Sequence, residues 1–131
     1  MSNIPEELHY SEEHEYVTVA EGEGDGVVLI GITDYAQGEL GDIVYVDLPA
    51  VGSSFAQMEV FGTIEAVKAV SELFCPIAGE IVAVNEELDG NPNLVNQDPY
   101  GEGWMIKMRP TNPDQVNQLL TAADYAQHIG E

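Results

Sequence analysis

Short β-type segments recur along the first 110 residues, and a glycine or proline ends or follows most of them. Segments of this length, rich in Val, Ile, Phe and Tyr, favour antiparallel strands joined by tight turns. The pattern therefore predicts a mainly β fold, either an antiparallel sandwich or a barrel. The predicted strands lie within Glu15–Ala20, Gly26–Ile32, Asp42–Pro49, Phe55–Val67, Ala69–Phe74, Gly79–Leu88 and Trp104–Pro110.

Glu21–Gly26 is a glycine-rich segment between two predicted strands. A phosphate-binding loop would need a following Lys-Ser or Lys-Thr pair and a helix, and neither follows. A hairpin turn is therefore the favoured prediction. Gly101 and Gly103 likewise precede a predicted strand, so we expect a tight loop there and not a dinucleotide-binding fingerprint.

One short helix is predicted in the amino-terminal half. Thr33 and Asp34 are suitable residues to cap a helix over Asp34–Leu40. Gly41 follows this segment and is a typical residue for ending a helix.

The carboxy-terminal segment has helical spacing in place of strand alternation. Asn112 and Pro113 favour a helix start, with Gln115 completing a capping box. Thr121 with Asp124 favours a second helix. We expect helices over about residues 112–129 to pack on a β core of about residues 9–110, in one domain spanning residues 1–131; a partner-binding helix is the alternative. One helix face would carry Val116, Leu119, Leu120 and Ala123.

The chain holds 24 acidic and 3 basic residues, a formal net charge of −21. Such a field repels phosphates, so we expect no nucleic-acid partner and no anionic membrane partner. The acidity favours a solvated surface, as in high-salt adaptation, over the alternative that it steers basic partner surfaces.

Cys75 is the single cysteine, which excludes an internal disulfide and fits a reducing compartment. Its apolar neighbours predict a buried thiol. The amino-terminal residues have neither the features of a signal peptide nor those of a transit peptide. We therefore expect a bacterial cytoplasmic protein, or a mitochondrial matrix protein if the chain is a processed form.

The three histidines, His9, His14 and His128, suggest no metal site. His14 has acidic neighbours, but consecutive residues of a strand point to opposite faces, so this run cannot surround one ion. Surface positions are the simpler expectation. No Ser-His-Asp or Cys-His signature appears in the local sequence either, and among 24 acidic residues no particular acid–base pair stands out.

Lys68 lies between two apolar strand segments in a chain that has only one other lysine. If the two segments pair as a hairpin, Lys68 lies at its tip and the amine projects into water. A projecting amine on a flexible stem is accessible to an acylating enzyme and can become the base of a mobile tether. A Schiff-base lysine, by contrast, would need a buried amine.

Around these residues the chain resembles the H-protein family of the glycine cleavage system. The resemblance covers nearly the whole chain as long blocks in the family's order. The matching blocks are His14–Tyr16, Gly31–Pro49, Ile64–Leu73, Pro76–Leu88 and Pro92–Lys107.

The resemblance implies a lipoyl/biotinyl-type barrel-sandwich hybrid with (R)-lipoate attached to Lys68. It also implies that Glu65 and Gly79, at the family's positions three before and eleven after the lysine, help the lipoylating enzyme recognise the chain. Where the family has "ESVKA" the chain has Ala66, and where it has Trp after "HE" the chain has Tyr16. Neither change removes the lysine, so lipoylation is still expected.

The family's loaded arm folds back against acidic side chains of the carrier. Glu15 and Glu72 match the positions expected for these contacts, whereas Glu13 stands where relatives have a small hydroxyl residue. A carboxylate beside a partly sheltered amine would stabilise the loaded state.

The resemblance implies a monomeric carrier of the aminomethyl group of glycine, and a protein that is not an enzyme. Its partners would be glycine decarboxylase (P protein), aminomethyltransferase (T protein), dihydrolipoamide dehydrogenase (L protein), and a lipoate ligase or lipoyl/octanoyl transferase. A related carrier that donates lipoate or serves sulfur metabolism remains an alternative. A biotin carrier is disfavoured because its lysine usually has methionine neighbours, and a 2-oxo acid dehydrogenase lipoyl domain because it is shorter and lacks the helices.

Overall fold

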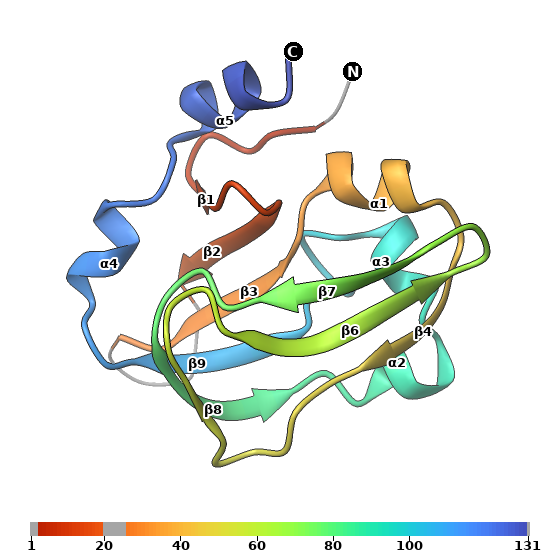
Figure 1. Cartoon of the computed structure of the whole chain (residues 1–131), viewed down its shortest axis with the longest axis horizontal. Coiled ribbons are helices and arrows are strands. Elements are labelled where there is room, and N and C mark those ends of the chain that lie inside the picture. Colours follow the sequence, from red (N-terminus) through yellow and green to blue (C-terminus); the bar gives the residue numbers. More distant parts are fainter. Residues whose placement is uncertain (1–2, 20–25, 131) are drawn as a thin grey trace.

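The computed structural model describes residues 3–19 and 26–130. Over these residues the chain forms two antiparallel sheets that do not close into a barrel (Figure 1). The six-stranded sheet has the order β1-β2-β3-β9-β8-β5, and the three-stranded sheet has the order β4-β6-β7. The strands are β1 (His9–Tyr10), β2 (Glu15–Val19), β3 (Val28–Ile32), β4 (Ile43–Asp47), β5 (Ser54–Phe55), β6 (Val60–Ala66), β7 (Val70–Phe74), β8 (Gly79–Val84) and β9 (Ile106–Pro110).

The mainly β fold predicted from the sequence is confirmed, with each predicted segment containing at least one strand. The strand predicted over Gly79–Leu88 ends early, at Val84. Asn85 explains this, because its side-chain amide donates to the carbonyl oxygens of Glu102 and Trp104, and its Oδ1 accepts from the Glu87 amide. The predicted turn over residues 21–25 lies outside the described residues.

Helix α1 (Asp34–Leu40) forms as predicted. The Thr33 hydroxyl accepts a hydrogen bond from the Ala36 amide, and Gly41 follows the helix at φ 81°. Two further short helices, α2 (Glu87–Gly90) and α3 (Leu94–Gln97), were not predicted. None of the helices in the described ranges is long and apolar enough to cross a membrane.

The carboxy-terminal segment forms two short helices, α4 (Asp114–Asn117) and α5 (Ala122–His128). Thr121 caps α5 as predicted, by accepting from the Asp124 amide. The capping box at Gln115 is wrong, because its side chain instead accepts from the Ala78 amide at 2.8 Å and so ties α4 to the loop before β8. The predicted continuous face is divided between two apolar clusters: Val116 and Leu119 pack on one and Leu120 on the other.

The main apolar core draws residues from both sheets. Strand β2 divides this core from a second cluster, because Val17 packs into the core while its neighbour Tyr16 packs into the other cluster. The second cluster joins β1 to α5, and the rings of Tyr10 and Tyr125 stack there with centroids 4.7 Å apart. The carboxy-terminal helix is thus fixed beside the amino-terminal strands (Figure 1).

Candidate functional site: a hairpin lysine beside a cavity

Lys68 lies at the tip of the β6–β7 hairpin, as predicted. The Ala66 amide donates to the Ala69 carbonyl oxygen at 2.7 Å, which leaves Val67 and Lys68 as the two central turn residues. Lys68 is exposed, and Val67 beside it is 71% exposed although it is apolar. The hairpin therefore presents an amine on a short and open turn.

The three basic side chains of the chain have different surroundings. Arg109 pairs with Glu80 at 3.8 Å, and Lys107 Nζ lies 4.9 Å from the centre of the Trp104 ring. Over the described residues, Lys68 makes no ion pair, with Glu65 or with any other carboxylate. Of the two lysine side chains, both within the described ranges, Lys68 is the one whose amine an approaching enzyme could reach without displacing a partner.

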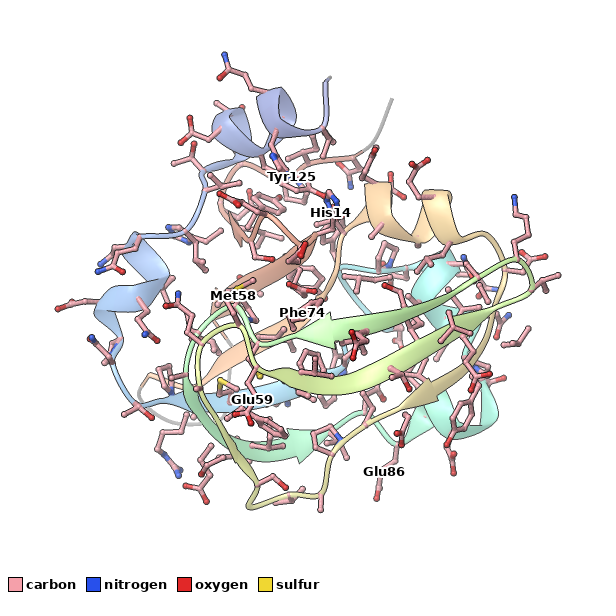
Figure 2. All side chains as sticks on the ribbon, in the orientation of Figure 1. His14, Met58, Glu59, Phe74, Glu86 and Tyr125 are labelled. Carbon is pink, nitrogen blue, oxygen red and sulfur yellow. The ribbon has the colours of Figure 1, made fainter. Side chains whose placement is uncertain are left out.

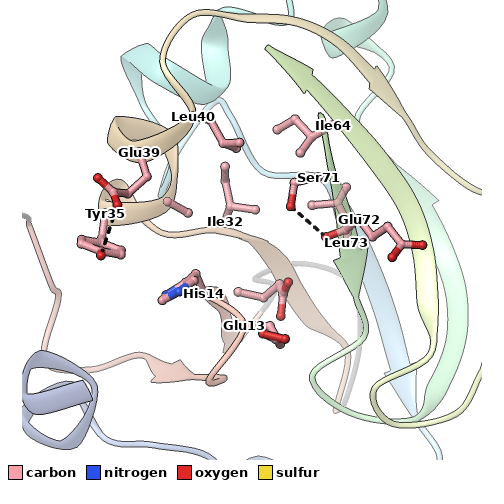
Figure 3. A pocket seen from close by; sticks show the side chains of 12 residues that line it. Glu13, His14, Ile32, Tyr35, Glu39, Leu40, Ile64, Ser71, Glu72 and Leu73 are labelled. Atoms are coloured by element: carbon pink, nitrogen blue, oxygen red, sulfur yellow. Dashed lines mark hydrogen bonds between the residues drawn. The ribbon is translucent and has the colours of Figure 1, made fainter. Parts of the chain in front are cut away.

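A cavity of about 230 Å³ lies beside this hairpin, between β7 on one side and β2, β3 and α1 on the other (Figure 3). Its walls combine apolar side chains with carboxylates, which suits a ligand that has both apolar and charged parts. The hairpin strands that carry Lys68 supply one wall of the cavity. The lining residues are Glu13, His14, Glu15, Ile32, Tyr35, Ala36, Glu39, Leu40, Ile64, Ser71, Glu72 and Leu73.

Glu15 is the buried carboxyl group of this cavity, at 1% exposure. Hydrogen bonds join its Oε1 to Ser11 Oγ at 2.6 Å and its Oε2 to the Phe74 amide at 3.3 Å. Burial raises the pKa of Glu15 to about 8, although the two hydrogen bonds oppose this rise. The cavity therefore holds a carboxyl group that is mostly protonated at neutral pH and that can ionise beside a cation.

Glu13 and Glu72 also line the cavity, but they are exposed. In Figure 3 the Glu72 carboxylate points away from His14 and Tyr35. Strand alternation explains this direction: Ser71 pairs with the buried Ile64 and Leu73 is itself buried, so Glu72 between them points to the opposite face of β7. Of the two carboxylates expected beside the loaded arm, Glu15 is thus enclosed and Glu72 stands at the edge.

His14 occupies a wall of the cavity and not the open surface expected from the sequence. It adopts φ 75°, an uncommon conformation for a non-glycine residue. Its Nδ1 lies 2.8 Å from the Tyr125 hydroxyl, which is also 2.7 Å from Thr33 Oγ1. Burial, and secondarily the nearby His128, lowers the pKa of His14. Figure 2 shows His14 and Tyr125 pointing toward each other between α1 and α5.

No local pattern in the sequence indicated this contact, because His14 and Tyr125 are 111 residues apart. In the described ranges there is also no group of three or more His, Cys, Asp or Glu residues that could hold a metal ion. Cys75 is buried, as predicted, and burial raises the pKa of its thiol to about 12.

Glu65 and Gly79 lie in different sheets. Glu65 pairs with Tyr45 on one side and Val70 on the other, near the hairpin tip. Gly79 is buried, and a Cβ atom there would lie 2.5 Å from the Arg109 carbonyl oxygen. Close packing of β8 on β9 therefore accounts for the glycine independently of any role in recognition.

Comparisons with known proteins all give the same family, over nearly the whole chain. The family model described as Glycine cleavage H-protein matches residues 8–131. The Glycine cleavage system H protein of Chromobacterium violaceum is 55% identical over 130 residues, which is 99% of each chain. That of Halalkalibacterium halodurans is 55% identical over all of this chain and 99% of its own. The crystal structure of such a protein from Mycobacterium marinum superposes with a TM-score of 0.88 at 41% identity, covering 98% of this chain and 100% of that one.

The two open sheets and the exposed hairpin lysine define a carrier domain of the lipoyl type, with a barrel-sandwich fold. The chain belongs to the glycine cleavage H-protein family. Its role in the glycine cleavage system is that of a lipoyl carrier and not of a catalyst, which confirms the function inferred from the resemblance and sets the biotin-carrier alternative aside.

Proposed function

We propose that the chain carries lipoate in amide linkage to Lys68. Its partners are then the P protein that decarboxylates glycine, the tetrahydrofolate-dependent T protein and the L protein, with a ligase or transferase attaching the arm. The observation that carries this proposal is the position of Lys68, whose amine lies on an exposed turn without a partner among the described residues, while the strands of that turn wall a cavity. When attached, lipoate supplies a dithiolane that takes up the aminomethyl group of glycine.

The surroundings of Lys68 fit such an arm. The amine is exposed and without a salt bridge among the described residues, so acylation neither breaks an ion pair nor buries a charge. Leu40, Ile32 and Ile64 give the adjoining cavity an apolar wall. Transfer of an apolar arm from water to such a wall lowers the free energy of the system.

Glu15 gives the cavity its response to charge. A cation that enters the cavity lowers the pKa of a nearby carboxyl group and favours its ionised form. The resulting carboxylate would hold a protonated amine by a charge-assisted hydrogen bond in a site sheltered from water. Ser11 and the Phe74 amide keep the carboxyl group oriented before the amine arrives.

Glu65 and Gly79 are proposed to help the attaching enzyme recognise the chain. Glu65 would do so directly, from the hairpin. Gly79 would act indirectly, because it allows β8 to pack closely on β9. The net charge of −21 supports the further proposal that partners dock through basic surfaces. A bacterial cytoplasm is the proposed location, since the relatives from Chromobacterium violaceum and Halalkalibacterium halodurans are bacterial and a buried free cysteine fits a reducing compartment.

The test is exchange of labelled bicarbonate into the carboxyl group of glycine by glycine decarboxylase. The lipoylated chain is expected to support this exchange, and the Lys68→Arg variant is expected to support none. The lipoylated H protein of Chromobacterium violaceum serves as the positive control. If that protein supports exchange and the lipoylated chain does not, the proposal is wrong and a lipoate-donor or sulfur-metabolism role takes its place.

A further inference from the structure

The corner segment comprises Gly41 and Asp42, which connect α1 to β4, together with Ile43, the first residue of β4. It touches the hairpin tip at two points. The Val67 amide donates to the Asp42 carbonyl oxygen at 3.0 Å. The Lys68 stem crosses the face of Gly41, so that Cε lies 3.0 Å from the position that a Cβ atom on Gly41 would occupy. Any larger residue at position 41 would crowd the stem.

One side chain from a third element holds this corner segment. Asn96 lies on α3, and its Nδ2 donates to the Gly41 carbonyl oxygen at 2.8 Å and to Gln37 Oε1 at 2.9 Å. Its Oδ1 accepts from the Ile43 amide at 2.9 Å. Asn96 therefore fixes the backbone on both sides of Asp42, the residue whose carbonyl oxygen receives the hairpin.

The contact with the corner segment is important for the conformation of the hairpin tip, because the β4–β6 ladder is irregular near the tip. The pairing shifts between Ile43 and Tyr45, next to the end of β6. Beyond that point the tip has its own turn hydrogen bond and the contact with the corner segment. Both Val67 and Val70 are largely exposed, so little apolar packing restrains the turn.

We propose that Asn96 is a positioning residue for the modification hairpin: by fixing the corner segment it directs Lys68 along the end of α1. Gly41 directly follows Leu40, which lines the cavity, so the stem lies beside the end of the helix that forms one wall of the cavity. The inference rests on the proposed attachment of lipoate at Lys68. It adds that the direction of the arm is set by an amide outside the hairpin.

The test compares Asn96→Asp with Asn93→Ala in the full, unmodified chain. The aspartate keeps an acceptor for the Ile43 amide but replaces the donor to the Gly41 carbonyl oxygen. Asn93 is an exposed asparagine that precedes the same helix and makes no side-chain capping hydrogen bond, so it is a matched control.

The first readout is hydrogen exchange of the Val67 amide by NMR, with the amides of β9 as an internal reference. Loss of a hydrogen bond that holds a local structure should accelerate exchange at Val67 by about tenfold in Asn96→Asp. The β9 amides should stay unchanged, and Asn93→Ala should behave like the wild type. An unchanged Val67 amide, or equal acceleration at Val67 and in β9, would overturn the positioning role.

The second readout is kcat/KM for lipoylation of the chain by a lipoate ligase, followed by intact mass. Asn96→Asp should lower this value several-fold and Asn93→Ala should not, since a turn of undefined direction presents its amine less often in a reactive orientation. Equal values for both variants contradict the inference. Absence of lipoylation in the wild type would instead refute attachment at Lys68, while the exchange experiment would still test the Asn96 contacts.

Discussion

The hairpin tip and the cavity beside it differ in the solvent exposure of their ionisable groups. In a chain with a net charge of −21, the tip leaves one amine exposed and without a salt bridge among the described residues. The cavity instead encloses one carboxyl group, Glu15, at 1% exposure and raises its pKa to about 8. Exposure makes Lys68 available for a covalent bond, whereas burial makes Glu15 sensitive to the charge of whatever enters. The two regions thus suit the two ends of one arm.

The largest expected effect concerns the tip. Lys68→Arg should abolish lipoylation completely, because a guanidinium is not acylated by the attaching enzyme. Lys107→Arg should leave it intact, since Lys107 lies over the Trp104 ring in a strand within a sheet. Intact mass after incubation with a lipoate ligase distinguishes the two variants. A lipoyl adduct that is still formed on the Lys68→Arg variant would show that the arm is attached somewhere other than the hairpin tip.

The next largest effect is expected for Glu15 in the cavity. In the lipoylated carrier loaded with the aminomethyl group, Glu15→Gln should shorten the lifetime of the loaded form by about tenfold or more, because glutamine cannot provide a charged acceptor. Glu13→Gln should change this lifetime much less, since Glu13 is exposed. The lifetime is measured as loss of the added mass over time. Equal lifetimes in both variants would show that burial of Glu15 is irrelevant to the load.

The raised pKa of Glu15 also predicts how stability depends on pH. The folded chain retains this proton above pH 4.5, where the unfolded chain releases it, so Glu15 lowers the free energy of unfolding as pH rises from about 4.5 to about 8. Glu15→Gln should remove this loss, on the order of 2–4 kcal/mol. Urea unfolding at pH 5 and pH 8 measures it. An equal pH dependence in the wild type and in Glu15→Gln would mean that Glu15 is ionised in the folded chain.

The smallest effect concerns the support behind the cavity wall. Tyr125→Phe keeps the stacking on Tyr10 but removes the hydroxyl between His14 and Thr33. We expect a loss of about 1–2 kcal/mol, because two polar groups lose a partner. Tyr45→Phe, at an exposed tyrosine, is the control and should change stability by less than about 0.5 kcal/mol. Thermal unfolding of both variants is the measurement, and equal melting temperatures would contradict this role of Tyr125.

The sequence predicted the tip better than the cavity, and the reason is physical. Strand alternation, Gly and Pro positions and a rare lysine are local patterns, so the β segments and the position of Lys68 could be predicted from neighbouring residues. The enclosure of Glu15 depends on Ser11 and on Phe74, which is 59 residues away. The family resemblance indicated Glu15 as a contact of the arm, but the burial of its carboxyl group could not be predicted from neighbouring residues.

The short helices α2 and α3 were missed for a related reason. Four-residue helices are not stable by themselves, so tertiary contacts determine them. Leu88 and Val95 anchor these helices in the core, and the Asn96 amide links α3 to backbone more than 50 residues earlier. The roles of Asn96 and Tyr125 could not be predicted from the sequence, because their partners are distant along the chain.

The most direct test of the account is an NMR comparison of the lipoylated carrier before and after loading with glycine and the P protein. If the arm on Lys68 lies in the cavity, chemical shifts should change for His14, Glu15 and Ser71. Shifts should stay constant around the separate cavity near Leu48. Changes confined to the turn residues 67–69 would show a load that stays in solvent, and would contradict the claim that hairpin and cavity serve one arm.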